Sequence, residues 1–129
     1  MKAVILITGD EITKGIVKDT SGGYLAESLT AMGYEVQSIV TVQDDAQCMI
    51  REMKGALERA DLLVITGGLG STFDDITLQT VARYAGRPLI YDGDYHGSLE
   101  RSFESRFRRK APADLERQAY TVEGSTILP

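Results

Sequence analysis

Short apolar runs alternate along this chain with longer segments in which apolar residues recur every three or four positions. The runs at residues 3–7 and 61–66 are continuously apolar, which is typical of strands covered on both faces of a sheet. A further strand is predicted between them at residues 35–42, a short one at 89–91 and a last one at 126–128. The pattern therefore predicts strands in both halves of the chain.

The segments between the first strands have the periodicity of helices. The first helix is expected to begin near residues 19–21 and to end before Gly33, because glycine suits the position after a helix. The second is expected to begin at Asp44, with Gln47 three positions later as in a capping box. Its buried stripe is predicted to consist of Ala46, Ile50, Met53 and Leu57.

Two more helices are predicted in the second half of the chain. Gly86 ends the third helix and Pro112 breaks the fourth, after which a short helical piece is expected at residues 113–119. The apolar positions that define these helices are Leu78, Val81, Ala82 and Ala85 in the third, and Tyr95, Leu99, Phe103 and Phe107 in the fourth.

Strands that alternate with helices favour parallel pairing through right-handed crossovers. We therefore expect a three-layer α/β/α sandwich with a mostly parallel sheet, in one domain over residues 1–129, since 129 residues suffice for one domain. In such sheets ligands bind beyond the carboxyl ends of the strands. This rule selects the loops at residues 8–11, 43–45 and 66–75, all rich in glycine or carboxylates.

Composition excludes several classes of site and partner. Cys48 and His96 are the sole cysteine and histidine, so an internal disulfide, a thiolate metal site and a multi-histidine site are excluded. The net charge of −5 provides no global basic field for duplex DNA or an anionic membrane. The apolar run at residues 3–7 is too short to span a membrane, which favours a cytoplasmic protein.

The fourth predicted helix is the one basic element. Its cations are Arg101, Arg106, Arg108, Arg109 and Lys110. We interpret them as a solvated face in preference to a site for nucleotide phosphates, because cations in the last turn complement the helix dipole. No nucleic-acid partner is expected, because no aromatic residues interleave on the exposed face and the total charge is negative.

A glycine-rich segment, residues 66–72, joins the strand at 61–66 to the third helix. Glycines allow positive φ and a close approach of the backbone to a ligand, and the N-terminus of the following helix favours an anion. The segment is neither a P-loop nor a dinucleotide fingerprint. Phosphate binding and a tight turn without a ligand are both compatible with it.

Pairs of acidic residues follow all three strands. Asp74 and Asp75 come after the glycines, Asp10 and Glu11 after the first strand, and Asp44 with Asp45 after the second. Such carboxylates can cap helices, and Asp44 has this structural explanation. Acidic side chains that converge at one sheet edge also suit Mg²⁺ beside a phosphate-bearing ligand, or a general base.

Together these motifs resemble the molybdopterin-binding superfamily. The resemblance rests on Gly9-Asp10-Glu11, on residues 66–70 and on Asp74-Asp75-Ile76-Thr77. The subgroup it resembles most is the N-terminal domain of CinA-type competence/damage-inducible proteins, supported by matches at residues 19–36 and 117–124. The fold of that superfamily is a three-layer α/β sandwich, in agreement with the pattern of the chain.

The resemblance also implies residue roles. Asp75 would be catalytic with Asp44 as the second acidic residue, and Asp10 and Glu11 would hold a metal ion, Mg²⁺. The residues that would bind the phosphate of a molybdopterin or nucleotide ligand are Thr66, Gly67, Gly68, Gly70, Ser71, Thr72, Asp74 and Thr77. The implied activity is Mg²⁺-dependent hydrolysis of a nucleotide-sugar pyrophosphate such as ADP-ribose. Molybdopterin adenylyl transfer and binding without turnover stay open, and relatives form dimers or trimers.

The chain departs from the subgroup at a few positions. Ser71 stands where these domains usually have proline, and Ser21 where they usually have asparagine. The sequence ends at Leu128-Pro129, before the family segment that closes the ligand pocket. We therefore expect an incomplete pocket, and we assign no nicotinamide-nucleotide deamidation, which belongs to a following domain in CinA proteins.

Overall fold

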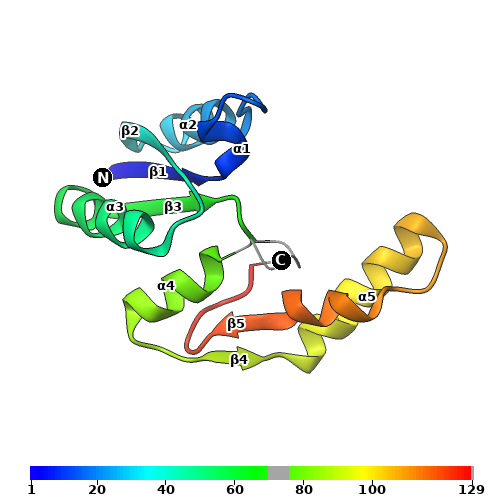
Figure 1. Cartoon of the computed structure of the whole chain (residues 1–129). Coiled ribbons are helices and arrows are strands. Elements are labelled where there is room, and N and C mark those ends of the chain that lie inside the picture. The colour runs from blue at the N-terminus through cyan, green and yellow to red at the C-terminus, as the bar shows by residue number, and fades with distance from the viewer. Residues whose placement is uncertain (70–75, 129) are drawn as a thin grey trace. The chain divides into compact units, whose positions relative to one another are not determined.

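A computed structural model describes residues 1–69 and 76–128 of the chain (Figure 1). Its contacts divide the chain into two compact units, Met1–Gly68 and Leu69–Pro129. Each unit is described by itself, and the single domain expected over residues 1–129 stays a prediction.

The first unit is a three-stranded parallel sheet with helices on both faces. Its elements are, in chain order, β1 (Lys2–Thr8), α1 (Asp10–Thr13), α2 (Ser21–Ala31), β2 (Glu35–Val42), α3 (Ala46–Arg59) and β3 (Leu62–Thr66). The strand order is β2-β1-β3, and both pairings of β1 are parallel. Figure 1 shows α2 and α3 on opposite sides of this sheet. The predicted parallel α/β architecture is confirmed in this unit.

The central strand β1 forms the core of the unit. Its residues from Ala3 to Thr8 are all buried, which explains why its sequence is continuously apolar. Ala3, Ile5 and Ile7 pack with Leu29 of α2 on one face. Met49, Met53 and Ala56 are the buried residues of α3, which covers the other face.

The start and the buried stripe of α3 differ from the prediction by one residue. The N-cap is Asp45, whose Oδ1 accepts the Cys48 backbone N–H over 2.8 Å, so the predicted cap at Asp44 is wrong. This hydrogen bond is the main reason why the pKa of Asp45 lies below its ordinary value. The predicted stripe is correct at Met53, but Leu57 is 45% exposed and Ala56 takes its place in the core.

The other elements of the first unit begin and end close to the predicted positions. Asp10 and Glu11 were expected in a loop and begin the short helix α1 instead. The helix α2 begins where expected, because the Asp19 carboxylate accepts the backbone N–H groups of Ser21 and Gly22 over 3.1 and 2.9 Å.

The second unit combines helices with a two-stranded antiparallel sheet. Its elements are α4 (Thr77–Ala85), β4 (Leu89–Tyr91), α5 (Gly93–Phe107), the 3₁₀ helix η1 (Ala113–Ala119) and β5 (Tyr120–Val122). Gly86 ends α4 in the left-handed conformation, at φ 65°, as the sequence predicts. The helices α4 and α5, the strand β4 and the short helical piece are therefore confirmed.

The last strand lies elsewhere than predicted. Residues 126–128 form no strand, and residues 120–122 pair with β4 instead. Tyr91 and Tyr120 are cross-strand partners with ring centroids 5.7 Å apart, an aromatic pairing that stabilises this register.

The predicted apolar face of α4 is also only partly correct, because Ala82 is buried but Ala85 is exposed. Among the described residues, no helix is long and apolar enough to cross a membrane.

Candidate functional site at the carboxyl edge of the parallel sheet

The parallel register places the ends of three strands at one edge of the first unit. Thr8 is paired with Val42, and Ile7 is paired with Thr66. The backbone N–H of Gly9 continues the ladder by donating to the Val42 carbonyl over 3.0 Å. The loops that the sequence selects as candidates therefore start side by side.

Asp10 and Asp44 bind each other's loops. The Asp10 backbone N–H donates to Asp44 Oδ2 over 3.1 Å, and the Asp44 N–H donates to Asp10 Oδ1 over 2.9 Å. Both side chains are half-buried. The structure thus brings together two of the carboxylates predicted for catalysis and metal binding, and Asp44 accepts the first N–H of α1 instead of capping α3.

Glu11 follows in the first turn of α1. Its side chain is exposed and folds back over Gly9, where an added Cβ would lie 2.8 Å from Glu11 Oε1. In the described part of the chain, no group of three or more His, Cys, Asp or Glu side chains is placed to hold a metal ion. Mg²⁺ usually takes one or two carboxylates together with waters and substrate phosphates, so the Asp10–Asp44 pair fits its donor preference.

Gly67 lies against the end of β1. Its φ of +92° is left-handed, and any Cβ there would collide with the Thr8 carbonyl oxygen and lie 2.9 Å from Thr8 Oγ1. Gly68 continues the turn at φ +60°. Only glycine fits the first of these positions, which explains in physical terms why the glycine segment begins there.

Thr8 is a residue of this edge that the sequence analysis missed. It is 1% exposed, and its hydroxyl donates to the Thr66 carbonyl over 3.4 Å. A polar residue at the end of a continuously apolar strand, directly before Gly9, was the available signal. Thr8 therefore contacts the backbone of the glycine segment on the neighbouring strand.

The remaining predicted site residues are distributed as follows. Thr66 ends β3 and is half-buried. Thr77 begins α4 in the second unit, where its side chain is buried. The predicted residues Gly70, Ser71, Thr72, Asp74 and Asp75 lie outside the described residues.

A separate polar cluster lies in the second unit. The Tyr91 hydroxyl is 2.7 Å from His96 Nδ1, and His96 Nε2 is 3.2 Å from Glu100 Oε1. Burial, with smaller contributions from Glu116 and Glu100, raises the pKa of the Tyr91 phenol. His96 thus lies between the Tyr91 hydroxyl and the Glu100 carboxylate.

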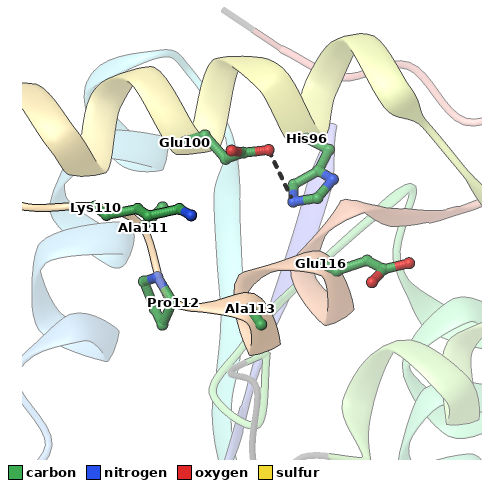
Figure 2. Close-up of a pocket in the computed structure, with 7 residues that line it drawn as sticks. All are labelled: His96, Glu100, Lys110, Ala111, Pro112, Ala113 and Glu116. Carbon is green, nitrogen blue, oxygen red and sulfur yellow. Dashed lines mark ion pairs between the residues drawn. The ribbon is translucent and has the colours of Figure 1, made fainter.

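His96 and Glu100 line a hollow of about 510 Å³, and the residues around it are drawn in Figure 2. Its lining residues are His96, Glu100, Lys110, Ala111, Pro112, Ala113 and Glu116, which come from α5, η1 and the segment between them. The lining carries charges of both signs, so it has no net preference for an anion.

Comparisons with known proteins agree with the fold. Residues 4–126 match a family described as "probable molybdopterin binding domain". A CinA-like protein from Thermosipho melanesiensis is 34% identical over 127 residues, which cover 98% of this chain and 31% of that protein. A putative competence-damage inducible protein from Streptococcus gordonii is 40% identical over 129 residues, which cover 100% of this chain and 31% of that protein. The chain thus spans about 31% of the length of these relatives.

Solved structures show the same architecture. A CinA protein of unknown function from Thermoplasma acidophilum superposes with a TM-score of 0.80 at 29% identity, over 95% of this chain and 70% of that chain. The molybdopterin biosynthesis enzyme MoaB from Thermus thermophilus superposes with a TM-score of 0.64 at 20% identity, over 94% of this chain and 77% of that chain. The second likeness is one of fold.

Proposed function

The chain belongs to the family of probable molybdopterin binding domains and is CinA-like, and from this premise we propose that it hydrolyses a nucleotide-sugar pyrophosphate. ADP-ribose is the substrate we propose, with Mg²⁺ as cofactor. The ligand would bind at the carboxyl edge of the sheet β2-β1-β3.

The observation that carries this proposal is the contact between Asp10 and Asp44. Two carboxylates from different loops are held by each other's backbone N–H groups, at the edge where parallel α/β sheets bind ligands. Gly67 and Gly68 lie at the end of the adjacent strand and turn the backbone there with positive φ, at +92° and +60°. An acidic pair next to an open glycine turn suits a ligand that carries both phosphates and a divalent cation.

In the proposed reaction, water attacks one phosphorus of the pyrophosphate and the bond from that phosphorus to the bridging oxygen breaks. AMP and ribose 5-phosphate are the products from ADP-ribose. Asp10 and Asp44 would hold Mg²⁺, which would offset the charge of the phosphates and polarise the phosphorus. Asp75 would be the catalytic carboxylate by resemblance to the family, and the glycine segment would position the phosphates.

A second candidate is a module that binds a pterin or nucleotide phosphate without turnover. In the described part of the chain, Asp10 and Asp44 are the carboxylates brought together at this edge, and no three such side chains are placed to hold a metal ion, which favours binding without turnover. Molybdopterin adenylyl transfer is a further alternative for the same pocket. The dimer or trimer implied by the resemblance also stays a prediction.

Product analysis separates these candidates. The chain is incubated with ADP-ribose in Mg²⁺ or in EDTA, and AMP is quantified by chromatography. We expect AMP with Mg²⁺ only, and a loss of about 10²–10⁴-fold in rate in Asp44→Asn and in Asp75→Asn, the range for a positioned acid or base. Asp114→Asn, at an exposed position in η1, is the matched control and should keep the wild-type rate.

Binding of ADP-ribose without any AMP would favour the non-catalytic module. AMP formation that persists in EDTA, or that is equal in all three variants, would contradict the proposed mechanism.

A further inference from the structure

The end of α5 carries a compact group of cations and aromatic rings that the proposed function does not use. We call it the basic-aromatic patch and define it as Phe103, Arg106, Phe107, Arg108, Arg109 and Lys110. It lies wholly within the second unit, so its geometry does not depend on the first.

Each aromatic ring of the patch has a guanidinium group over it, and the two rings contact each other at an interplanar angle of 42°. The ring centroids of Phe103 and Phe107 are 4.7 Å apart. The guanidinium carbon of Arg106 is 5.5 Å from the centroid of Phe107, and that of Arg109 is 5.5 Å from the centroid of Phe103. Both distances are within the range of cation–π contacts. Four side chains thus form one continuous set of planar groups.

The backbone turns at the end of the helix and so completes this arrangement. Arg108 follows Phe107 in the left-handed conformation, at φ 52°, and ends α5. The chain beyond it folds back, because Arg109 lies over the ring of Phe103, six residues earlier. Cations of the last turn and cations after the helix are therefore gathered at one place.

Among the described residues, the cations Arg106, Arg108, Arg109 and Lys110 form no ion pair. The carboxylate of Glu104, the acidic residue in this segment, accepts the Ala111 backbone N–H over 3.5 Å. The patch is thus a local excess of positive charge on a chain whose net charge is −5.

One ring of the patch is available at the surface. Phe107 is 52% exposed. We expected no nucleic-acid partner in part because the exposed face of this helix was predicted to lack aromatic side chains. The exposed ring of Phe107 shows that this part of the argument was wrong. The helix dipole accounts for cations near the end of α5, but it does not account for their layering on aromatic rings.

We propose that the basic-aromatic patch binds single-stranded nucleic acid. Proteins that bind single strands without sequence preference combine cations that follow the phosphates with aromatic side chains on which bases stack. Guanidinium planes also stack on bases. An acidic peptide would use the charge of the patch but not its planar faces. Paired bases in a duplex are not accessible for such stacking, so single strands are the ligand that matches both features. This proposal does not depend on the proposed hydrolysis.

The test is fluorescence anisotropy of the full chain with a labelled oligo(dT), and with a duplex and polyglutamate as competitors. Each phosphate contact on a single strand contributes about 0.7 to the slope of log K against log salt. Four cations predict that affinity falls about 50-fold between 50 and 200 mM salt. Arg106→Gln with Arg109→Gln should reduce this dependence to about sevenfold, and Phe107→Leu should weaken binding about tenfold by removing a stacking face.

The matched control is Lys54→Gln with Arg83→Gln, which removes two exposed cations from α3 and α4. It should bind oligo(dT) as the wild type does. Absence of binding at 50 mM salt, equal loss in the control, equal affinity for the duplex, or equal competition by polyglutamate would each overturn the proposal.

Discussion

Asp10 and Asp44 donate their backbone N–H groups to each other's carboxylates, over 3.1 and 2.9 Å. The contact joins the loop after β1 to the loop after β2, which are separated by 34 positions in the sequence. It has a structural and a chemical consequence. It fixes the two loops relative to each other, and it holds two carboxylates where the proposed ligand would bind.

Substitutions at Asp44 separate these two consequences. Asp44→Ala removes the acceptor of the Asp10 N–H and should lower the free energy of unfolding by about 1–2 kcal/mol, since the site is half-buried. Asp44→Asn keeps an acceptor oxygen and should lose less than roughly half of that amount. Chemical denaturation measures both. Equal losses in the two variants would contradict the hydrogen-bonded role, whatever their effect on hydrolysis.

Gly67 should tolerate no side chain. Gly67→Ala places a Cβ against the Thr8 carbonyl oxygen, whereas Gly33→Ala introduces the same substitution at a φ of +90° with no atom within 4 Å. Gly33→Ala should therefore cost only the left-handed conformation, about 1 kcal/mol. Gly67→Ala should cost a further ~1–3 kcal/mol from the steric clash. Denaturation of both variants gives the difference, and equal losses would show that the contact with Thr8 is unimportant.

The cap of α2 predicts a dependence of stability on acid. The hydrogen bond from the Ser21 hydroxyl is the main cause that holds the pKa of Asp19 below its ordinary value of 3.8. Because the folded-state pKa is the lower one, the stabilisation is present above pH 3.8 and is lost as the pH falls through the folded-state pKa.

Ser21→Ala tests this assignment. It should move the pKa of Asp19 back towards its ordinary value, and Asp19→Asn should remove this part of the acid dependence altogether. The measurement is the free energy of unfolding across the acid range, with Asp114→Asn as an exposed control. Profiles of Ser21→Ala and wild type that superimpose would refute the proposed cause.

The Tyr91 phenol should ionise above its ordinary pKa. Burial, and then the nearby Glu116 and Glu100 carboxylates, raise the pKa of its phenol above the ordinary value of 10.0. The stabilisation is present below pH 10.0 and is lost as the pH rises through the folded-state pKa. In an absorbance titration of phenolate, Tyr91→Phe should remove a component that titrates above pH 10.0. If the lost component titrates at the ordinary value, the assigned environment of Tyr91 is incorrect.

The sequence predicts best the elements whose environment is uniform. The strand β1 is buried on both faces, so its sequence is continuously apolar, and this run predicts a buried strand. Gly33 and Gly86 marked helix ends correctly, because both have positive φ, at 90° and 65°, which glycine adopts without strain. Local chemistry is sufficient in these cases.

Prediction failed where a distant residue decides between local alternatives. Aspartate is a favourable N-cap residue, so the sequence does not distinguish Asp44 from Asp45. In the structure the Asp44 carboxylate accepts the N–H of Asp10, which is distant in the sequence, and Asp45 caps α3. The buried stripe of α3 also depends on how the helix packs on the sheet, and there Ala56 is buried while Leu57 is exposed. The strand at residues 120–122 was missed because its pairing with β4, including Tyr91 with Tyr120, is not visible in so short a segment.

The candidate site was predictable in its location but not in its contacts. The rule that ligands bind at the carboxyl ends of parallel strands selected the loops that contain Asp10, Asp44 and Gly67. The sequence did not show that Asp10 and Asp44 exchange hydrogen bonds, nor that Gly67 lies against Thr8. These contacts depend on the strand order β2-β1-β3, which the helical and apolar periodicities do not encode.

Ligand binding at the carboxyl edge of the sheet is the central claim, and a thermal-shift titration tests it most directly. ADP-ribose, ATP, AMP and a pterin phosphate are compared with and without Mg²⁺, on the wild type and on Asp44→Asn. At a hundredfold excess over Kd, a ligand should add about 2.7 kcal/mol and raise Tm by several degrees. We predict such a shift with ADP-ribose that requires Mg²⁺ and is reduced in Asp44→Asn. No shift with any of these ligands, or one that is equal in Asp44→Asn and without Mg²⁺, would contradict the account.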